Sequence, residues 1–208
     1  MAILKHLFDM KTCAVVPLET PCMPALPAEG DALRRGLVLR ASAPDDRNFL
    51  QQVFIGTRAP EFAAAGLDAD AIHGLLVQQF TMQDEYYRRH YPKGRFDVVL
   101  DGACRIGRLY HDWHSGEARI IDIALLPEYR GAGIGTRLMK TIVAEAARRA
   151  LAVSLYVELD NPVRGFYRRL GFEAIGEDGV YERMRRKAAP FHDREFEPAA
   201  GLTEAVAA

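Results

Sequence analysis

The first part of the chain carries the apolar pattern of one strand and then of two helices. Residues 37–40 (Leu-Val-Leu-Arg) form a predicted strand. Ser42 is the expected cap of a first helix that has Pro44 in its first turn. A second predicted helix is stopped by Pro92. Apolar residues recur at helical spacing on one face of each helix, at Phe49, Leu50, Val53 and Phe54 in the first and at Ile72, Leu75, Leu76, Phe80, Tyr86 and Tyr87 in the second.

The rest of the chain alternates between strand patterns and helix patterns. Asp101-Gly102 is a hairpin signal between two strand-like runs, and Gly171 stands where a short helix should end. A long amphipathic helix is predicted to begin at Ile134. In chain order we expect strands at 96–100, 104–110 and 119–126, a helix at 134–150, a strand at 153–159, a helix at 162–170, and a hairpin around 177–179 that ends near 184.

These elements predict an α/β fold built on one mixed sheet. The strand–helix–strand unit across residues 120–159 needs parallel neighbours, whereas the hairpins need antiparallel ones. We expect a single domain over residues 36–186, with six or seven strands and about four helices. Residues 1–35, which are rich in proline, are expected to form an irregular leader, and residues 187–208 a polar tail.

Composition and charge narrow the class of protein. The chain has 208 residues, and its 27 Lys and Arg nearly balance its 28 Asp and Glu, which gives a formal net charge of −1. That balance offers no long-range attraction to nucleic acid or to anionic membranes, so neither is an expected partner. No apolar run reaches membrane-spanning length, and the first residues lack the continuous apolar core of a secretory signal. The three scattered cysteines favour a reducing compartment, so we expect a cytoplasmic protein.

A glycine-rich turn joins a predicted strand to the long helix. Unpaired N–H groups at a helix start and the helix dipole favour an anion, and glycines let a phosphate approach the backbone. A Walker loop and a dinucleotide fingerprint both fit this turn badly, because neither the required lysine nor the third glycine is present. Two interpretations of the turn remain. It binds another phosphate-containing ligand, or it is an ordinary strand–helix turn in which glycine serves packing. The residues are Arg130, Gly131, Ala132, Gly133, Ile134, Gly135 and Thr136.

A second constellation, Asn161-Pro162 through Phe166-Tyr167 to Gly171-Phe172, lies one predicted strand downstream. Together with Arg-x-x-Gly-x-Gly at 130–135, it resembles motifs A and B of the GNAT acetyltransferase superfamily. In element order the resemblance extends over residues 37–185. It implies that residues 130–136 cradle the pyrophosphate of coenzyme A, that Asn161 reaches the pantetheine arm, and that Tyr167 lies near the thioester sulfur. Taken alone, Tyr167 would be a core aromatic residue.

The resemblance also implies a mechanism. In this superfamily the strand before the loop splays from the next strand, and its backbone, here Leu125 and Leu126, binds pantetheine and polarises the thioester carbonyl. An amine then attacks directly, without a covalent enzyme intermediate. Tyr167 is the expected general acid for the departing thiolate, since the usual pKa values are about 10 for tyrosine and about 8.5 for a thiol.

Asp122 is the candidate general base. A lone carboxylate in an apolar strand is costly to bury, so it either takes a proton from the amine or is held by an arginine such as Arg108 or Arg119. Strand alternation places it opposite Ile121 and Ile123. Many members of the superfamily have a glutamate where Arg119 stands, which leaves the base open. His111 and His114 are interpreted as surface residues, and no metal is expected.

The expected activity is that of an acyl-CoA-dependent N-acyltransferase, with acetyl-CoA as co-substrate and a small-molecule or peptide amine as acceptor. Two alternatives stay open. One is a non-catalytic acyl-CoA-binding or sensor module, and the other is an acyltransferase for a longer acyl group. Neither the acceptor nor the oligomeric state, a homodimer included, follows from the sequence.

Overall fold

The computed structural model of the protein describes residues 36–64, 68–114 and 116–188. The expected leader, residues 1–35, lies outside the described residues, and so does most of the expected tail, residues 189–208. Within the described ranges the chain forms seven strands and four α-helices. In chain order these are β1 (Leu37–Ala41), α1 (Arg47–Ala64), α2 (Ala69–His90), β2 (Arg95–Asp101), β3 (Cys104–Asp112), β4 (Ala118–Leu125), α3 (Ile134–Arg148), β5 (Val153–Glu158), α4 (Arg164–Arg169), β6 (Glu173–Asp178) and β7 (Tyr181–Arg186).

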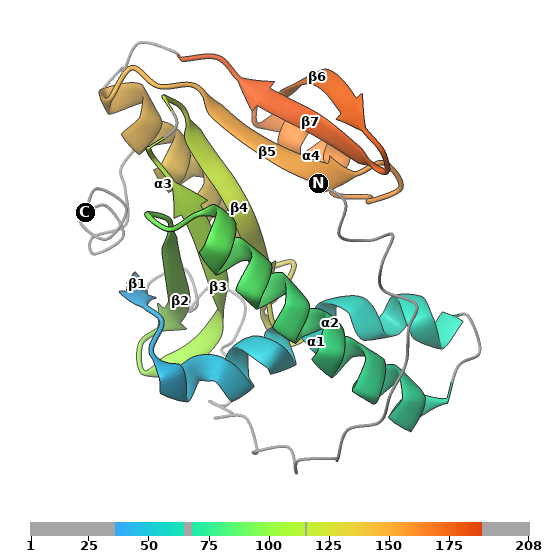
Figure 1. Ribbon diagram of the computed structural model, residues 1–208. Coiled ribbons are helices and arrows are strands. Elements are labelled where there is room, and N and C mark those ends of the chain that lie inside the picture. Colours follow the sequence, from blue (N-terminus) through green and yellow to red (C-terminus); the bar gives the residue numbers. More distant parts are fainter. Residues whose placement is uncertain (1–35, 65–67, 115, 189–208) are drawn as a thin grey trace.

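The strands form a single sheet in the order β1-β2-β3-β4-β5-β7-β6 (Figure 1). Every neighbouring pair is antiparallel except β4 and β5, which are parallel and joined by the crossover helix α3. The hairpin between β2 and β3 turns at Gly102, whose φ of 60° suits glycine. The predicted mixed α/β sheet is therefore confirmed.

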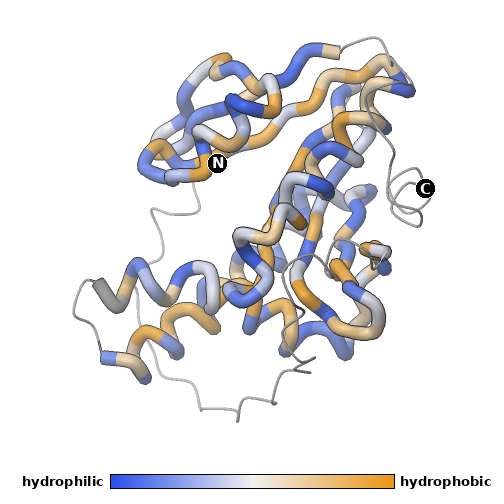
Figure 2. The backbone as a smooth tube through the Cα atoms, turned by 180° about the vertical axis from the view of Figure 1, so that it is seen from behind, coloured by the Kyte–Doolittle hydropathy of each residue, from blue (hydrophilic) through white to orange (hydrophobic). Residues whose placement is uncertain are grey.

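Helices cover both faces of the sheet and form two separate cores. On one face α3 and α4 pack over the strands, with Leu138 and Ile142 fully buried. On the other face α1 and α2 bury Val53 and Leu76. Each such side chain contributes about 1.5–3 kcal/mol when it is fully buried. Polar and apolar stretches alternate along the helices in Figure 2, as expected for elements with one buried face. None of the helices in the described ranges is long and apolar enough to cross a membrane.

The entry to α1 differs from the prediction. A 3-10 turn, Pro44–Asp46, precedes the helix, and its cap residue is Ala43, so the assignment of Ser42 as the cap is wrong. The side chain of Asp46 takes that role and accepts the N–H of Ala43 at 2.8 Å. Arg40 binds the same carboxylate with two hydrogen bonds of 2.8 Å and lowers the pKa of Asp46 to about 2.

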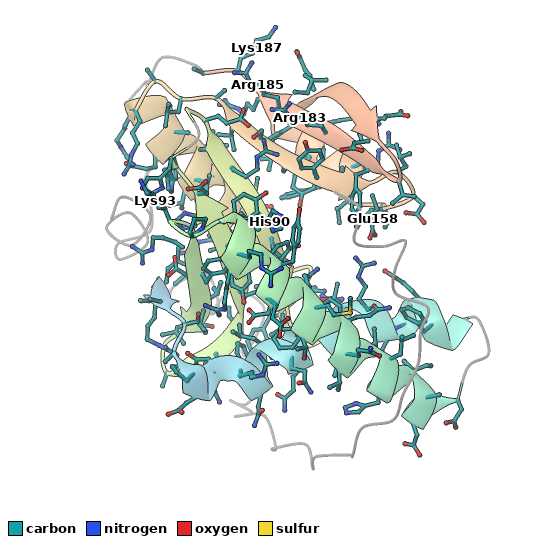
Figure 3. The ribbon with its side chains drawn as sticks, in the orientation of Figure 1. His90, Lys93, Glu158, Arg183, Arg185 and Lys187 are labelled. Atoms are coloured by element: carbon teal, nitrogen blue, oxygen red, sulfur yellow. The ribbon has the colours of Figure 1, made fainter. Side chains whose placement is uncertain are left out.

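β4 and β5 pair only at their beginnings. Ala118 lies opposite Val153 and Arg119 opposite Ser154, and the ladder then stops, although β4 continues to Leu125 and β5 to Glu158. In Figure 1, β5 turns away from β4 and runs beside β7 and β6. We call the separation between residues 120–125 and 155–158 the opening. It is bridged by Arg58 of α1, which binds Glu158 (labelled in Figure 3) at 2.7 Å.

A β-bulge in β4 lies where the opening begins. Tyr110 of β3 is opposite Asp122, but His111 is opposite Ile120, so Ile121 is an extra residue. Such a bulge increases the local twist, which helps β4 to leave β5. It also interrupts the alternation of side chains, and Ile121 packs in the α1/α2 core together with Ala124. The expectation that Ile121 lies on the face opposite Asp122 is therefore wrong.

Candidate active site

The loop between β4 and α3 has the backbone form that an anion needs. Gly131 and Gly133 have φ values of 79° and 77°, which side chains other than glycine rarely adopt. The space beside the Cα atoms of Gly131, Gly133 and Gly135 is open, with no atom within 4 Å of an added Cβ. The N–H of Arg137 binds the carbonyl of Gly133 at 3.0 Å, so the N–H groups before Arg137 at the start of α3 have no helical partner. These residues fit a phosphate or a pyrophosphate.

Arg130 holds this loop in place. Its Nε donates to the carbonyl of Leu125 at 2.9 Å, and its Nη2 donates to the carbonyl of Gly56 at 3.3 Å and to Oγ1 of Thr57 at 3.1 Å. The side chain thus ties the end of β4 to α1. Backbone N–H groups are therefore the main donors that the glycine loop offers.

The two leucines at the end of β4 differ in what they can offer a ligand. The N–H of Leu126 donates to the carbonyl of Ile106 on β3 at 2.9 Å, so Leu126 has no free N–H, which corrects that part of the expectation. Backbone groups of successive strand residues point to opposite sides of the strand. The N–H of Leu125 therefore points toward the opening.

Tyr167 lies in α4, with 8% of its surface exposed and its ring 6.0 Å from the ring of Phe172. Arg164 anchors the helix by two hydrogen bonds, of 3.0 and 2.6 Å, to the carboxylate of Glu182 on β7. Burial raises the pKa of Tyr167 to about 12, and the negative charge of Asp122 acts in the same direction. Tyr167 is thus protonated at neutral pH and within electrostatic reach of Asp122, across the opening.

Asn161 shapes the turn that leads into α4. Its Oδ1 accepts the N–H of Val163 at 3.0 Å, and its own N–H donates to the carbonyl of Glu158 at 3.0 Å. With the side-chain oxygen engaged in the turn, the NH₂ group at the other end of the amide is the part that Asn161 can present to a ligand.

Asp122 is ion-paired with Arg108, one of the two arginines considered from the sequence. The distance from Arg108 Nη2 to Asp122 Oδ2 is 2.8 Å, and the two side chains are 3% and 14% exposed. The same Nη2 donates to Oε1 of Gln83 on α2 at 3.1 Å. Arg119, the other candidate, binds Glu117 at 2.6 Å instead.

Two tyrosines lie around this ion pair, Tyr87 half-buried and Tyr110 buried. Burial raises the pKa of Tyr87 well above its usual value, and Asp122 raises it further while Arg108 opposes the shift. Burial likewise raises the pKa of Tyr110 to about 12. Arg108, Gln83 and Tyr87 belong to no sequence motif, and only the fold brings them to Asp122. A signal for Arg108 did exist, since its charge interrupts an apolar strand.

One further residue was missed by the sequence analysis and another was interpreted wrongly. Arg137, in the first turn of α3, has a buried Nη1 without a hydrogen-bond partner in the described part of the chain, beside the glycine loop. His111 is 1% exposed, so its interpretation as a surface residue is wrong, whereas His114 is exposed. Trp113 Nε1 donates to His111 Nδ1 at 2.8 Å, which explains how the ring is accommodated. Residues 36–64, 68–114 and 116–188 contain no group of three or more potential ligands that could hold a metal ion.

Comparison with known proteins agrees with this geometry. A model of the acetyltransferase (GNAT) family matches residues 69–172, half of the 208 residues. A candidate ribosomal protein bS18-alanine N-acetyltransferase of Bacillus subtilis is 30% identical over 121 residues, which cover 52% of this chain and 77% of that protein. The solved PaiA N-acetyltransferase of Thermoplasma acidophilum, in complex with coenzyme A, aligns over 73% of this chain and 98% of its own, with a TM-score of 0.58 and 19% identity. An acetyltransferase of Thermus thermophilus aligns over 73% and 97%, with a TM-score of 0.55 and 18% identity.

The family match runs from the start of α2 to just beyond α4, so it includes elements on both sides of the opening. The structural similarities, all at low identity, show the fold. The family match and the Bacillus relative go further. This chain belongs to the GNAT acetyltransferase family and is an N-acetyltransferase that uses acetyl-CoA.

Proposed function

We propose that the enzyme transfers an acetyl group from acetyl-CoA to a primary amine by direct attack in a ternary complex. The observation that supports this proposal best is the opening between β4 and β5. It has the glycine loop at one end, Tyr167 on the α4 side and Asp122 on the α1/α2 side. Two substrates could therefore meet there from opposite faces of the sheet.

On the acetyl-CoA side the proposal relies mainly on backbone groups. The N–H groups of residues 131–136 would bind the pyrophosphate, and the amide of Asn161 would bind the pantetheine arm. The N–H of Leu125 would polarise the thioester carbonyl, as a donor aimed at the charge that develops during attack. Arg130 would position the loop and the end of β4.

Tyr167 and Asp122 would share the proton transfers. A tyrosine with a pKa of about 12 is a weak acid for a thiolate whose thiol has a pKa of about 8.5, and full transfer would be uphill by about 5 kcal/mol. The charge of Asp122 is one cause of that high pKa. A proton taken from the amine by Asp122 would cancel this charge and lower the pKa of Tyr167, just as the thiolate leaves. The two transfers would thus assist each other.

The acceptor class is the finer part of the proposal. The Bacillus relative is named for an alanine of a ribosomal protein, so a peptide N-terminus is the first candidate acceptor for this chain. A small-molecule amine is the second.

The test is turnover against a panel of amines. Purified protein is mixed with acetyl-CoA and with peptides that have a free N-terminus, peptides with only a lysine amine, or small amines, and both free thiol and product mass are measured. We expect thiol release that depends on the amine, and a product heavier by one acetyl group. Coenzyme A binding without release for any amine would support the sensor alternative. Faster thiol release from longer acyl-CoAs would support the alternative of an acyltransferase for a longer acyl group.

A further inference from the structure

An arginine cluster lies on the acceptor side of the sheet, just before the opening. It consists of Arg119 on β4 and Arg183 and Arg185 on β7, gathered around Glu117. Oε1 of Glu117 accepts hydrogen bonds from Arg119 at 2.6 Å and from Arg183 at 3.3 Å, and Oε2 lies 3.5 Å from Nε of Arg185. Ser154 donates to the same Oε1 at 2.6 Å.

The position of this cluster follows from strand register. Arg185 is paired with Ser154 and Arg183 with Tyr156, and paired residues of antiparallel strands share one face. Val153 and Met184, which alternate with these residues, are buried in the core under α3 and α4. The arginines therefore face the α1/α2 side, from which the acceptor would approach.

The cluster carries more positive than negative charge. Burial favours a protonated Glu117, but its hydrogen bond with Ser154 and the charge of Arg119 lower its pKa, so the carboxylate is ionised. Three guanidinium groups face two carboxylates, Glu117 and Asp112, the latter opposite Arg119 on β3, which leaves an excess of one positive charge. In Figure 3, Arg183 and Arg185 follow one another along β7, so two of the three arginines of the cluster come from this strand.

Two donors of the cluster are not used by the residues that the structure describes. Nη1 of Arg119 and Nε of Arg183 are buried and have no hydrogen-bond acceptor among the residues that the structure describes. The guanidinium of Arg119 also lies over the ring of Tyr156, 5.0 Å from its centroid, which fixes its plane. A planar guanidinium that is held on one edge and on one face is pre-organised to bind a second carboxylate or a phosphate.

The cluster lies at a defined distance from the proposed reaction centre. Arg119 lies opposite Asp112 of β3 and Asp122 opposite Tyr110, so the bulge at Ile121 reduces their separation along the strand to that of two residues, about 7 Å. The end of α2 faces the same space, because Arg119 partly opposes the burial-driven rise of the pKa of Tyr91. An acceptor that lies between α2 and the β5–β7 strands would have its amine at Asp122 and its other end at the arginines.

We propose that the acceptor carries an anionic oxygen group, a carboxylate or a phosphate, about 7 Å from the amine that is acetylated, and that Arg119 and Arg183 bind this group. The inference rests on the proposed function, because Asp122 marks the position of the amine. In an extended peptide, about 7 Å places an acidic side chain roughly two residues from the N-terminal amine. Arg119 and Arg183 then determine which amines are acetylated.

The experiment compares acceptors that differ only in this charge. Peptides that begin Ala-Ala-Glu-Glu are paired with the same peptides that begin Ala-Ala-Gln-Gln, and small amines of about that length that end in a carboxylate or a phosphate are paired with the corresponding amide or alcohol. We expect kcat/KM to be at least tenfold higher for the anionic member of a pair, and this advantage should shrink as ionic strength rises. A larger difference between the peptides would identify the anion as an acidic side chain of a peptide. A larger difference between the small amines would identify it as a group of a small molecule.

Arg183→Gln is the decisive variant, because Arg183 is 40% exposed and its replacement disturbs the fold less than that of Arg119. We expect it to remove most of the anionic advantage while KM for acetyl-CoA stays unchanged. Lys140→Gln, the same loss of charge on the exposed side of α3, is the matched control and should keep the advantage. Equal kcat/KM for both members of every pair, or an advantage that survives Arg183→Gln, would overturn the inference.

A binding measurement separates this inference from the proposed transfer. Calorimetric titration of both peptides into the protein with coenzyme A reports selectivity without turnover. If the anionic peptide binds more tightly and Arg183→Gln removes this preference, the inference is supported even when no thiol is released. The absence of thiol release would contradict only the proposed transfer. Turnover with equal binding of the two peptides would contradict the inference alone.

Discussion

The two sides of the opening are built from different parts of the chain. On the α3 side the candidate binding groups are backbone N–H groups from a few consecutive residues, 131–136, and three glycines keep the space beside them open. On the α1/α2 side the groups are side chains: Gln83 and Tyr87 from α2, Arg108 from β3 and Asp122 from β4.

This difference has consequences for both stability and specificity. A loop that binds through its backbone tolerates many side chains but requires its glycines. A site made of interacting side chains from several elements changes with each substitution, and its buried charges must remain paired. We therefore expect substitutions on the α3 side to act on acetyl-CoA affinity, and substitutions on the α1/α2 side to act on stability and acceptor choice. The predictions below test this division, beginning with the largest effect.

Tyr167 stands between the two sides, and its replacement should separate chemistry from binding. In Tyr167→Phe we expect kcat to fall by roughly 10²–10⁴-fold, because the proton donor for the thiolate is lost. The affinity for acetyl-CoA, measured by calorimetry, should change little, since the glycine loop is intact. Tyr110→Phe is the control, because it removes another buried hydroxyl whose pKa is also about 12. Wild-type kcat in Tyr167→Phe would return Tyr167 to the role of a core aromatic residue.

Asp122→Asn tests the α1/α2 side of the opening, where the candidate groups are side chains. It leaves Arg108, only 3% exposed, without a carboxylate, and breaking a buried ion pair in this way costs about 3–5 kcal/mol. For a protein of this size we expect the melting temperature to fall by about 6–20 °C. At a temperature at which the variant is folded, kcat should fall as well, because the proton acceptor is gone.

Glu173→Gln is the control for this loss of stability, since it breaks an exposed ion pair with Lys187 and should cost under about 1 kcal/mol. An Asp122→Asn variant that melts early but keeps the kcat of the wild type while folded would leave Asp122 a structural role only.

Gly133→Val tests the α3 side of the opening, where the candidate binding groups are backbone N–H groups. Its φ of 77° is strained for valine, by about 1–2 kcal/mol, and the new side chain would enter the space in which a phosphate is expected. We expect the Kd for coenzyme A, measured by calorimetry, to rise by roughly 10–100-fold. Gly102→Val is the matched control, because Gly102 has a φ of 60° and equally open surroundings but lies in the β2–β3 turn. A similar loss of stability in both variants with unchanged affinity would remove the phosphate role of the loop.

The same division explains what could be predicted from the sequence. The glycine loop, Tyr167 and the order of elements lie in continuous motifs or periodic patterns, so they could be read directly. The ion pair of Asp122 with Arg108 depends on which strands are neighbours and on the register between β3 and β4, which residue spacing alone does not give. The bulge at Ile121 also escaped prediction, because an extra residue leaves the apolar pattern of β4 unchanged.

His111 shows a related limit of prediction. Its burial depends on two neighbours, Trp113 Nε1 at Nδ1 and the buried carboxylate of Asp97, 3.3 Å from Nε2, and such neighbours are visible only in three dimensions. Likewise, the expected N–H of Leu126 is taken by Ile106, a residue of another strand. Patterns along the chain reveal local structure, whereas the pairing of polar groups between strands decides which of them remain available.

The smallest expected effect concerns alkaline pH and the buried tyrosine Tyr110 on the α1/α2 side. The hydroxyl of Tyr110 is buried without a hydrogen-bond partner in the described part of the chain, so Tyr110→Phe should change the free energy of unfolding by no more than about 0.5 kcal/mol at pH 8. The two proteins should diverge above pH 10. There the unfolded state releases the phenolic proton, whereas folded Tyr110, with a pKa of about 12, retains it. Each pH unit between 10 and 12 therefore favours unfolding of the wild type by about 1.4 kcal/mol more than unfolding of the variant.

Urea unfolding of both proteins at intervals from pH 8 to 11.5 measures this difference directly. We expect the stability of the wild type to fall more steeply with pH, so that Tyr110→Phe is the more stable protein by about 1–2 kcal/mol at pH 11. Parallel curves would mean that the folded state ionises Tyr110 as readily as the unfolded state does. The α1/α2 side would then be open to water around this ring, and the contrast between a dry side-chain site and an open backbone loop would not hold.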